Sequence, residues 1–346
     1  MTADEGSTQL GDELEPGSRL AGYRIERLLG RGGMGSVYEA TQVSLDRRVA
    51  LKVISRRLGA DESFRERFRR ESRAAAAVEH PNLLPVYEAG DTPDGRLYLS
   101  MRFVDGGDLE SRLRRLGPLG AAEVLSILGQ IAGALDHAHA AGLIHRDVKP
   151  ANVLLEERRG AVHAYLADFG LAKEIHATTA HTETGKLLGT VDYLAPEQIA
   201  GEDYGPAVDV YAFGGVVYRA LTGSVPYRRD TSAATLIAHR EAPVPRPSER
   251  APGLPVVFDE LVARAMAKDP NRRAASAGEL IAWATEALES AGEPVDPEET
   301  PTMVDLADEG TEVLGQERSP ARKLFMYIAV YAPIWVAAYL LGRNVL

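Results

Sequence analysis

The chain has 346 residues, 45% of them hydrophobic, which is enough to bury a sizeable core or two lobes with additional segments. It contains no cysteine, which excludes disulfides, a thiolate metal site and a cysteine nucleophile. The formal net charge is -11, but residues 1–18 hold five acids and residues 290–317 hold nine, with no Lys or Arg in either range. The rest has 36 acids against 39 bases, a balance that gives no indication of a nucleic-acid groove.

The chain begins with an acidic tail, residues 1–22, which we expect to be disordered because it has little apolar patterning. This tail lacks the basic region and the apolar stretch of a secretory signal. Residues 23–104 contain short apolar runs typical of strands and one helical stretch, 63–78. The predicted strands are 23–29, 37–40, 49–54, 84–89 and 97–103.

The pattern changes at Gly106 and Gly107, beyond which the sequence is mainly helical. The predicted helices of this part are 123–141, 206–222, 256–267 and 277–291. A strand-rich segment followed by a helical segment predicts an α+β protein with two lobes. The expected lobes are a small β-rich N-lobe, residues 23–104, and a larger helical C-lobe, residues 105–290.

The C-terminal part differs in composition from the two lobes. Residues 291–323 are acidic and carry prolines, which is typical of a flexible linker. Residues 324–342 contain no charge, and these 19 residues are about long enough to cross a bilayer as a helix. More Lys and Arg precede this stretch than follow it, so the positive-inside rule places residues 1–323 in the cytoplasm. We expect a single pass through the cytoplasmic or inner membrane; the alternative is a buried C-terminal helix.

A glycine-rich run, Gly30 to Val37, fits the pattern GxGxxGxV. Glycines let a backbone turn tightly over phosphates and present N–H donors at close range. The residues that follow predict a strand, whereas a dinucleotide-binding fold requires a helix directly after the glycines. Taken alone, the run is equally consistent with a glycine-rich hairpin turn.

Lys52 interrupts the apolar strand Val49–Val53. A lysine that points inward from such a strand requires an anionic partner. Glu71 lies 19 residues further on, in the predicted helix, and is the candidate partner. The alternatives are a lysine that reaches water from a strand edge and a glutamate that pairs with a neighbouring arginine.

Residues 145–152, HRDVKPAN, resemble the catalytic loop H-R-D-x-K-P-x-N of protein kinases. The lysine two residues after the aspartate is typical of the serine/threonine branch of that family. The resemblance implies that Asp147 accepts the hydroxyl proton and orients the nucleophile. It also implies that Lys149 steadies the transferring phosphoryl group and that Asn152 binds Mg²⁺.

Further motifs follow in kinase order, and together they cover roughly residues 23–289. Asp168-Phe169-Gly170 resembles the magnesium loop, which implies that Asp168 holds the metal. The run GTVDYLAPE at 189–197 resembles the segment that shapes a peptide site; Thr190 in it would bond to the catalytic aspartate. By resemblance, Glu197 pairs with Arg273, and Asp209 braces the catalytic loop.

The chain is therefore identified as a member of the bacterial eukaryotic-like (Hanks-type) serine/threonine protein kinases, anchored in a membrane. The resemblance implies the two-lobed protein-kinase fold, with ATP and Mg²⁺, or Mn²⁺ in its place, bound between the lobes. Lys52, held by Glu71, would contact the α- and β-phosphates. Met101 would be the gatekeeper and Arg102–Val104 the hinge that pairs with adenine. The residues expected at the nucleotide are Leu29, Gly30, Arg31, Gly32, Gly33, Met34, Gly35, Val37, Ala50, Lys52, Met101, Val104 and Leu154.

Two positions depart from the family pattern. Arg102 stands where relatives often carry an acid, and its side chain should point away from adenine, so we expect no loss of ATP binding. Ala274 stands where proline commonly follows the arginine, which concerns stability more than chemistry.

The implied activity is ATP-dependent phosphorylation of serine and threonine hydroxyls on proteins, in membrane-associated signalling. Thr182 and Thr184 lie in the expected activation loop, and a phosphate there would pair with Arg146. We therefore predict trans autophosphorylation within a homodimer. Threonines of the acidic linker, once phosphorylated, would suit a phosphothreonine-binding partner, with a plain tether as the alternative.

Two other functions stay open. A pseudokinase scaffold is disfavoured because the lysine and both aspartates that such proteins usually lose are present: Lys52, Asp147 and Asp168. A small-molecule kinase of related fold is disfavoured because the run at 189–197 is typical of a peptide site.

Overall fold

The computed structural model describes residues 13–169 and 191–292. The expected activation-loop threonines, Thr182 and Thr184, lie outside the described residues, as do almost all of the linker and the whole of 324–342. Among the described residues, no helix has both the length and the apolar character that a membrane crossing requires. Both lobes belong to one compact unit.

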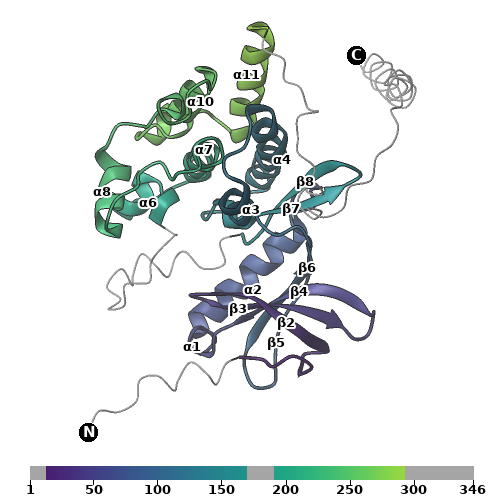
Figure 1. The fold of residues 1–346 in the computed structure, drawn as a ribbon. Coiled ribbons are helices and arrows are strands. Elements are labelled where there is room, and N and C mark those ends of the chain that lie inside the picture. The colour runs from purple at the N-terminus through teal and green to yellow at the C-terminus, as the bar shows by residue number, and fades with distance from the viewer. Residues whose placement is uncertain (1–12, 170–190, 293–346) are drawn as a thin grey trace, which may run out of the picture. The chain divides into compact units, whose positions relative to one another are not determined.

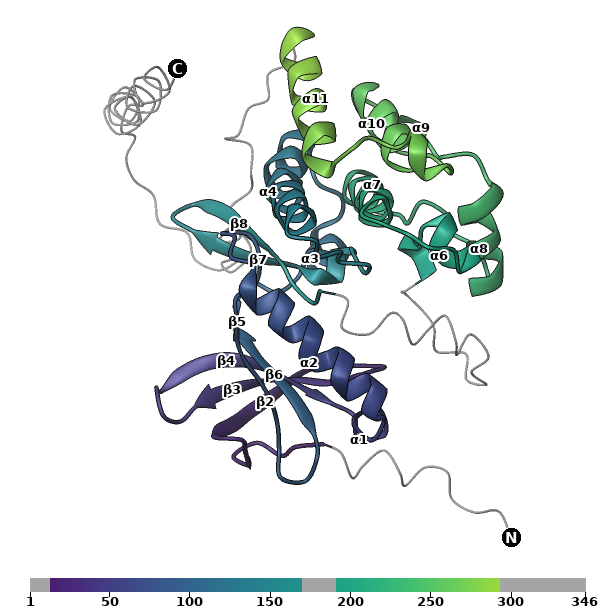
Figure 2. The same cartoon turned by 180° about the vertical axis from the view of Figure 1, so that it is seen from behind.

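The N-lobe is built on a six-stranded antiparallel sheet with the order β1-β2-β3-β4-β6-β5. Its strands are β1 (Arg19–Leu20), β2 (Tyr23–Gly32), β3 (Gly35–Gln42), β4 (Arg47–Ile54), β5 (Val86–Asp91) and β6 (Leu97–Arg102). Helices α1 (Arg56–Gly59) and α2 (Glu62–Ala77) connect β4 to β5. Figures 1 and 2 show α2 beside the sheet from opposite sides.

The two faces of the sheet bury different clusters, because side chains alternate along each strand. On β4, Val49, Leu51 and Val53 pack into a cluster with Tyr23 and Tyr38. Ala50 and Ile54 pack on the other face, with the α2 residues Phe64 and Phe68. Lys52 lies between Ala50 and Ile54 in this alternation, which directs it toward the α2 side of the sheet. Helix α2 begins after Asp61, whose side chain accepts a hydrogen bond from Phe64 N.

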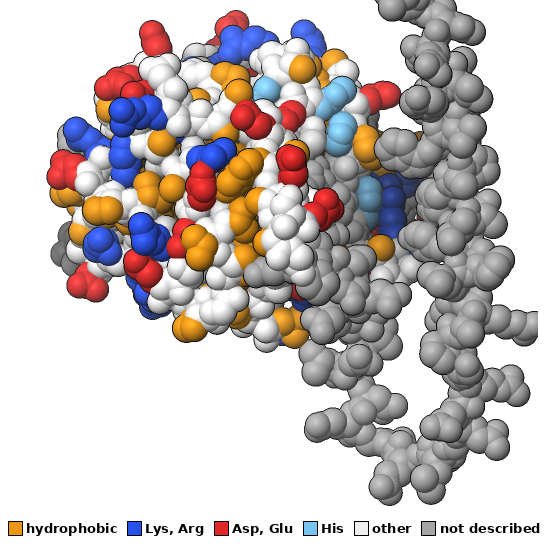
Figure 3. Space-filling view, turned by 90° about the horizontal axis from the view of Figure 1, so that it is seen from above, with side chains coloured by type: hydrophobic (Ala, Val, Ile, Leu, Met, Phe, Trp, Pro, Cys, Tyr) orange, Lys and Arg blue, Asp and Glu red, His pale blue; other side chains and the backbone are white. Residues whose placement is uncertain are grey.

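The C-lobe is mainly helical, as the sequence predicts. Its helices are α3 (Leu109–Leu116), α4 (Ala121–Ala140), α6 (Pro196–Ala200), α7 (Ala207–Thr222), α8 (Ser232–Glu241), α9 (Pro247–Arg250), α10 (Val257–Ala265) and α11 (Ala277–Ser290). Single 3₁₀ turns lie at η1 (Pro150–Asn152), η2 (Val191–Tyr193) and η3 (Pro270–Arg272). The core gathers around α4 and α7, both of which are largely buried. On the face seen in Figure 3, acidic, basic and apolar side chains are interspersed.

A two-stranded hairpin, β7 (Val153–Arg158) and β8 (Ala161–Leu166), follows the catalytic loop. Its turn places Arg159 at φ 52° and Gly160 at φ 80°, the left-handed pair that a tight hairpin turn needs. Leu84 N donates to Leu166 O at 2.9 Å, which ties the start of the β5 segment to β8. The two-lobed α+β architecture is thus confirmed, with this hairpin as an element that the sequence reading did not assign as strands.

Candidate active site

The glycine-rich run forms the end of β2, a turn at Gly33 and Met34, and the start of β3, so it is a hairpin and not a strand-to-helix turn. A Cβ on Gly35 would lie 2.0 Å from Val53 O, and the residue has φ +154°. Only glycine fits there without displacing β4. Arg31 turns outward instead, because its guanidinium pairs with Glu13 of the N-terminal segment.

The structure does not pair Lys52 with Glu71, the partner that the sequence predicts; Lys52 is paired with Asp168 instead. Lys52 Nζ lies 2.9 Å from Asp168 Oδ2, and its side chain is only 12% exposed. Glu71 Oε1 instead lies 3.5 Å from Arg146 Nη1 and 3.9 Å from Arg70 Nη2. The strand fixes the direction of Lys52, but the side chain that meets it depends on where α2 rests, and here Glu71 faces the catalytic loop.

Asp209 accepts hydrogen bonds from the backbone of the catalytic loop, as the resemblance implies. Asp209 Oδ2 accepts from His145 N, and Oδ1 accepts from Arg146 N, both at 2.7 Å. His139, which the sequence reading missed, places Nε2 2.8 Å from Asp209 Oδ2. Arg146 has φ +65°, a strained left-handed conformation that these bonds support.

His145 is buried and links the catalytic loop to the segment before Phe169. Asp147 N donates to His145 Nδ1 at 3.2 Å, so the proton on the ring lies at Nε2, which donates to Ala167 O at 2.8 Å. Burial lowers the pKa of His145, so its ring stays neutral and connects Asp147 N to Ala167 O by hydrogen bonds. The ring of Phe169 lies 4.7 Å from that of His145, centroid to centroid.

Three predicted catalytic and metal residues lie together in the loop. Lys149 Nζ lies 2.7 Å from Asp147 Oδ2. Asn152 Nδ2 donates to Asp147 O at 2.8 Å and approaches Asp147 Oδ2 at 3.3 Å. Ala167 N donates to Asn152 O at 2.8 Å, which brings Asp168 next to this group. An acid, an amide and a lysine are thereby placed where a hydroxyl and a phosphate could meet.

The donor set fits a magnesium ion that also binds phosphate oxygens. Asn152 uses its Nδ2 within the loop, which leaves Oδ1 to face a cation, and Asp168 supplies a carboxylate. No group of three or more His, Asp or Glu side chains gathers as a metal cage among the residues that the structure describes. Mg²⁺ is usually held by one or two carboxylates, waters and substrate phosphates, so two protein ligands are sufficient.

The expected adenine-binding residues come together from both lobes. Val37, Ala50, Met101, Val104 and Leu154 belong to one apolar cluster. Leu29 is the exception: it lies outside this cluster and is 38% exposed.

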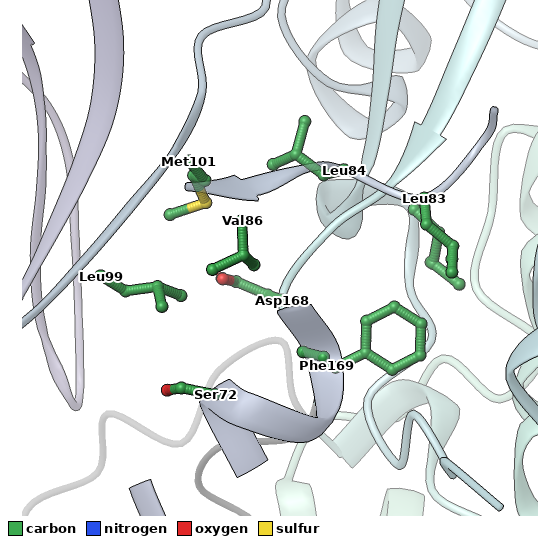
Figure 4. A pocket seen from close by; sticks show the side chains of 10 residues that line it. Ser72, Leu83, Leu84, Val86, Leu99, Met101, Asp168 and Phe169 are labelled. Carbon is green, nitrogen blue, oxygen red and sulfur yellow. The ribbon is translucent and has the colours of Figure 1, made fainter. Parts of the chain in front are cut away.

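An apolar pocket is lined by residues of α2, β5 and β6, with Met101 and Asp168 among them. Figure 4 shows Met101, Leu99 and Val86 around the carboxylate of Asp168, with Ser72 of α2 on the opposite side. The site therefore places apolar side chains next to the charged side chains of Lys52, Asp147 and Asp168.

The site and the two-lobed fold define the protein-kinase class, and comparisons with known proteins agree. Residues 23–289 match the family model described as protein kinase domain, so the chain belongs to that family. The chain is 44% identical over 282 residues to the serine/threonine-protein kinase PknJ of Mycobacterium tuberculosis, covering 81% of this chain and 47% of that protein. It is 44% identical over 274 residues to PknH from the same organism, covering 79% and 43%.

A solved structure agrees with these sequence matches. The crystal structure of the Mycobacterium tuberculosis PknI kinase domain matches with a TM-score of 0.64 and 35% identity, over 79% of this chain and 99% of that one. These matches support a serine/threonine protein kinase domain. The chain spans about half the length of the curated relatives that it matches.

Proposed function

We propose that this chain transfers the γ-phosphoryl group of ATP to serine and threonine hydroxyls of proteins. The observation that carries the proposal is the group formed by Asp147, Lys149 and Asn152, joined by contacts of 2.7 to 3.3 Å. These three residues stand on a loop whose backbone is fixed by Asp209. Catalysis of phosphoryl transfer depends mostly on such positioning and on electrostatic stabilisation.

Each residue would then have a separate task. Asp147 would accept a hydrogen bond from the acceptor hydroxyl and orient its oxygen for attack. Lys149, beside Asp147, would place positive charge against the transferring group. Lys52 would bind phosphate oxygens, while Asn152 and Asp168 would hold the metal. When bound, ATP with Mg²⁺ would supply the phosphoryl group, and the metal would offset the charge that develops during transfer.

The position of Glu71 suggests that the described arrangement is a resting one. Lys52 is paired with Asp168, and Glu71 is turned to Arg146. We infer that activation moves Glu71 from Arg146 to Lys52, because a lysine paired with Glu71 leaves both oxygens of Asp168 available to a metal. A phosphate on Thr182 or Thr184 would favour this exchange by competing for the guanidinium of Arg146.

The test uses the full chain, γ-labelled ATP with Mg²⁺, and three otherwise identical peptides that contain serine, threonine or tyrosine. We expect label on the serine and threonine peptides only, and none with an Asp147→Asn variant. Binding of ATP without transfer to any acceptor would favour the pseudokinase scaffold. Transfer to small-molecule alcohols but not to peptides would favour the small-molecule kinase.

Autophosphorylation and membrane anchoring are separate parts of the proposal. Peptide mapping after incubation with Mg²⁺ and ATP should find phosphate at Thr182 or Thr184, and unchanged activity of the Thr182→Ala, Thr184→Ala double variant would contradict a role in activation. Residues 324–342 are proposed to anchor the chain, with the kinase domain in the cytoplasm. Carbonate extraction tests this: release of the full chain into the soluble fraction would contradict it.

A further inference from the structure

The segment that joins the two lobes carries charges with partners on the opposite lobe. From here on the hinge includes the next residue as well, so that it runs from Arg102 to Asp105 and not only to Val104. At its first residue, the end of β6, Arg102 Nη2 lies 3.1 Å from Glu156 Oε1 and 3.3 Å from Oε2, on β7 of the C-lobe. At its last residue, Asp105 Oδ1 accepts a hydrogen bond from Nη2 of Arg48, on β4 of the N-lobe, at 2.8 Å. The two ion pairs are therefore crossed: each end of the hinge is tied to the lobe that lies beyond the other end.

The Arg102–Glu156 pair is the better supported of the two. Its side chains are 34% and 22% exposed, so solvent screens it only in part. Glu156 also accepts from Arg158 Nε at 2.5 Å and from Tyr165 Oη at 3.2 Å. The guanidinium carbon of Arg102 lies 5.2 Å from the centre of the Tyr165 ring, within reach of a cation–π contact.

Glu156 is charged and its orientation is fixed. Burial alone would raise the pKa of Glu156, but the hydrogen bonds from Arg102 and Arg158 outweigh this effect and hold the pKa below its usual value. The carboxylate therefore stays ionised at neutral pH and keeps its attraction for the hinge.

The Arg48–Asp105 pair is exposed and weaker by itself. Its side chains are 52% and 72% exposed. The Arg48 guanidinium also lies over the ring of Phe103, 4.4 Å from its centre, so one side chain of β4 contacts two hinge residues. Arg48 further binds Glu39 on the adjacent strand, which limits its own freedom.

Backbone contacts anchor the residues just after the hinge to the same strand that carries Glu156. Leu155 N donates to Gly107 O at 2.9 Å, and a Cβ on Gly106 would lie 2.1 Å from Leu155 O. Leu154, one of the residues expected beneath adenine, forms an isolated bridge with Asp108. Strand β7 thus holds the far end of the hinge through its backbone and the near end through Glu156.

We propose that Arg102 and Glu156 are positioning residues that fix the hinge against β7, so that its backbone is prearranged to meet the adenine base. The proposal rests on the proposed use of ATP. It also explains why an arginine can stand at position 102, where relatives often carry an acid. The Arg102 side chain is directed to the Glu156 carboxylate on β7. Without the pair, the hinge would sample more arrangements, and nucleotide binding would have to select among them.

The expected signature is weaker ATP binding without loss of chemistry. A fixed hinge favours the bound ground state and the transition state equally, so its loss should raise KM and Kd for ATP while kcat at saturating ATP stays unchanged. We expect the Kd of Mg²⁺-bound ATP to rise about 3- to 10-fold in Arg102→Gln and in Glu156→Gln. This is the size of effect expected for a hydrogen-bonded ion pair that solvent screens only in part.

The experiment uses the full chain and a double-mutant cycle. Kd for ATP and steady-state KM and kcat are measured for the wild type, both single variants and the double variant. The double variant should lose no more affinity than either single one, because both remove the same contact. Arg102→Lys keeps the charge but loses the planar guanidinium over Tyr165, so it should weaken ATP binding less than Arg102→Gln does. The matched control is Arg24→Gln, which breaks the exposed pair with Glu26 on β2, and it should not change Kd.

The outcomes separate this inference from the proposed function. If the wild type binds ATP and transfers phosphate, but Arg102→Gln and Glu156→Gln leave Kd unchanged, the positioning role is refuted alone. Additive losses in the double variant would also refute it, as would an equal fall in kcat. If the wild type neither binds nor uses ATP, both proposals fail. Should Arg102→Gln fail to fold, as judged by thermal unfolding, Glu156→Gln and Arg102→Lys supply the comparison.

Discussion

Replacing Glu197 with alanine is expected to destabilise the C-lobe by about 3–5 kcal/mol, because it leaves a buried guanidinium without its counter-charge. Glu197 Oε1 and Oε2 lie 2.5 Å and 2.8 Å from Arg273 Nη1 and Nη2. The Arg273 side chain is 0% exposed and that of Glu197 is 5% exposed. Arg273 Nε also donates to Ala267 O at 2.8 Å and Nη1 to Ala207 O at 2.9 Å, so neutral carbonyls stay beside the arginine when Glu197 is removed, but its counter-charge is lost.

Thermal and urea unfolding of the full chain measure this loss, which corresponds to about 6–20 °C in Tm for a domain of this size. The matched control is Glu260→Ala, which breaks a pair with Arg264 whose side chains are 54% and 45% exposed. That change should stay within about 0.5 kcal/mol. A Glu197→Leu, Arg273→Leu double variant should be less destabilised than Glu197→Ala, since no charge stays buried. A loss for Glu197→Ala as small as that for Glu260→Ala would refute the reasoning.

Three further changes follow from the same structure. Gly35→Ala should lower stability by about 1–3 kcal/mol and weaken ATP binding, because the added Cβ meets Val53 O at 2.0 Å; unchanged unfolding and unchanged Kd would contradict this. Burial lowers the pKa of His239 from 6.5 to about 3, so between these values the unfolded state binds the extra proton and stability falls as pH falls. His239→Gln should reduce this fall in a pH series of unfolding measurements. A variant whose stability falls with pH as steeply as that of the wild type would contradict this. Asp209→Asn should lower kcat at least about tenfold at unchanged circular dichroism, because one of the two oxygens that accept from His145 N and Arg146 N is replaced by an NH₂ donor; turnover equal to that of the wild type would contradict this.

Much of the fold can be predicted because local patterns and the final packing agree. The apolar run 49–54 predicts a strand, and it lies within β4 (Arg47–Ile54), where Ala50 and Ile54 pack on the face next to α2. The helix predicted over 63–78 is α2 (Glu62–Ala77), which begins after its Asp61 cap. The β7–β8 hairpin was missed because β7 ends in charged residues, although Arg159-Gly160 is a turn signal.

The site is predictable where one short segment contains all of its members. Asp147, Lys149 and Asn152 lie within six residues of each other, and the structure places them in contact. Partners that are distant in the chain are harder to predict, because they depend on how helices rest on the sheet. Glu71 has the right charge and spacing for Lys52, yet α2 presents it to Arg146. The Glu156 partner of Arg102 also lies 54 residues away, with no local signal to connect the two.

The central claim, that Asp147 directs phosphoryl transfer from ATP to a hydroxyl, is tested most directly by the single-turnover rate of an Asp147→Asn variant at saturating Mg²⁺ and ATP. The account predicts a rate lower than that of the wild type by about 10²–10⁴, with the Kd for ATP within about twofold, because Asp147 acts on the acceptor hydroxyl and not on the nucleotide. A transfer rate equal to that of the wild type would contradict it.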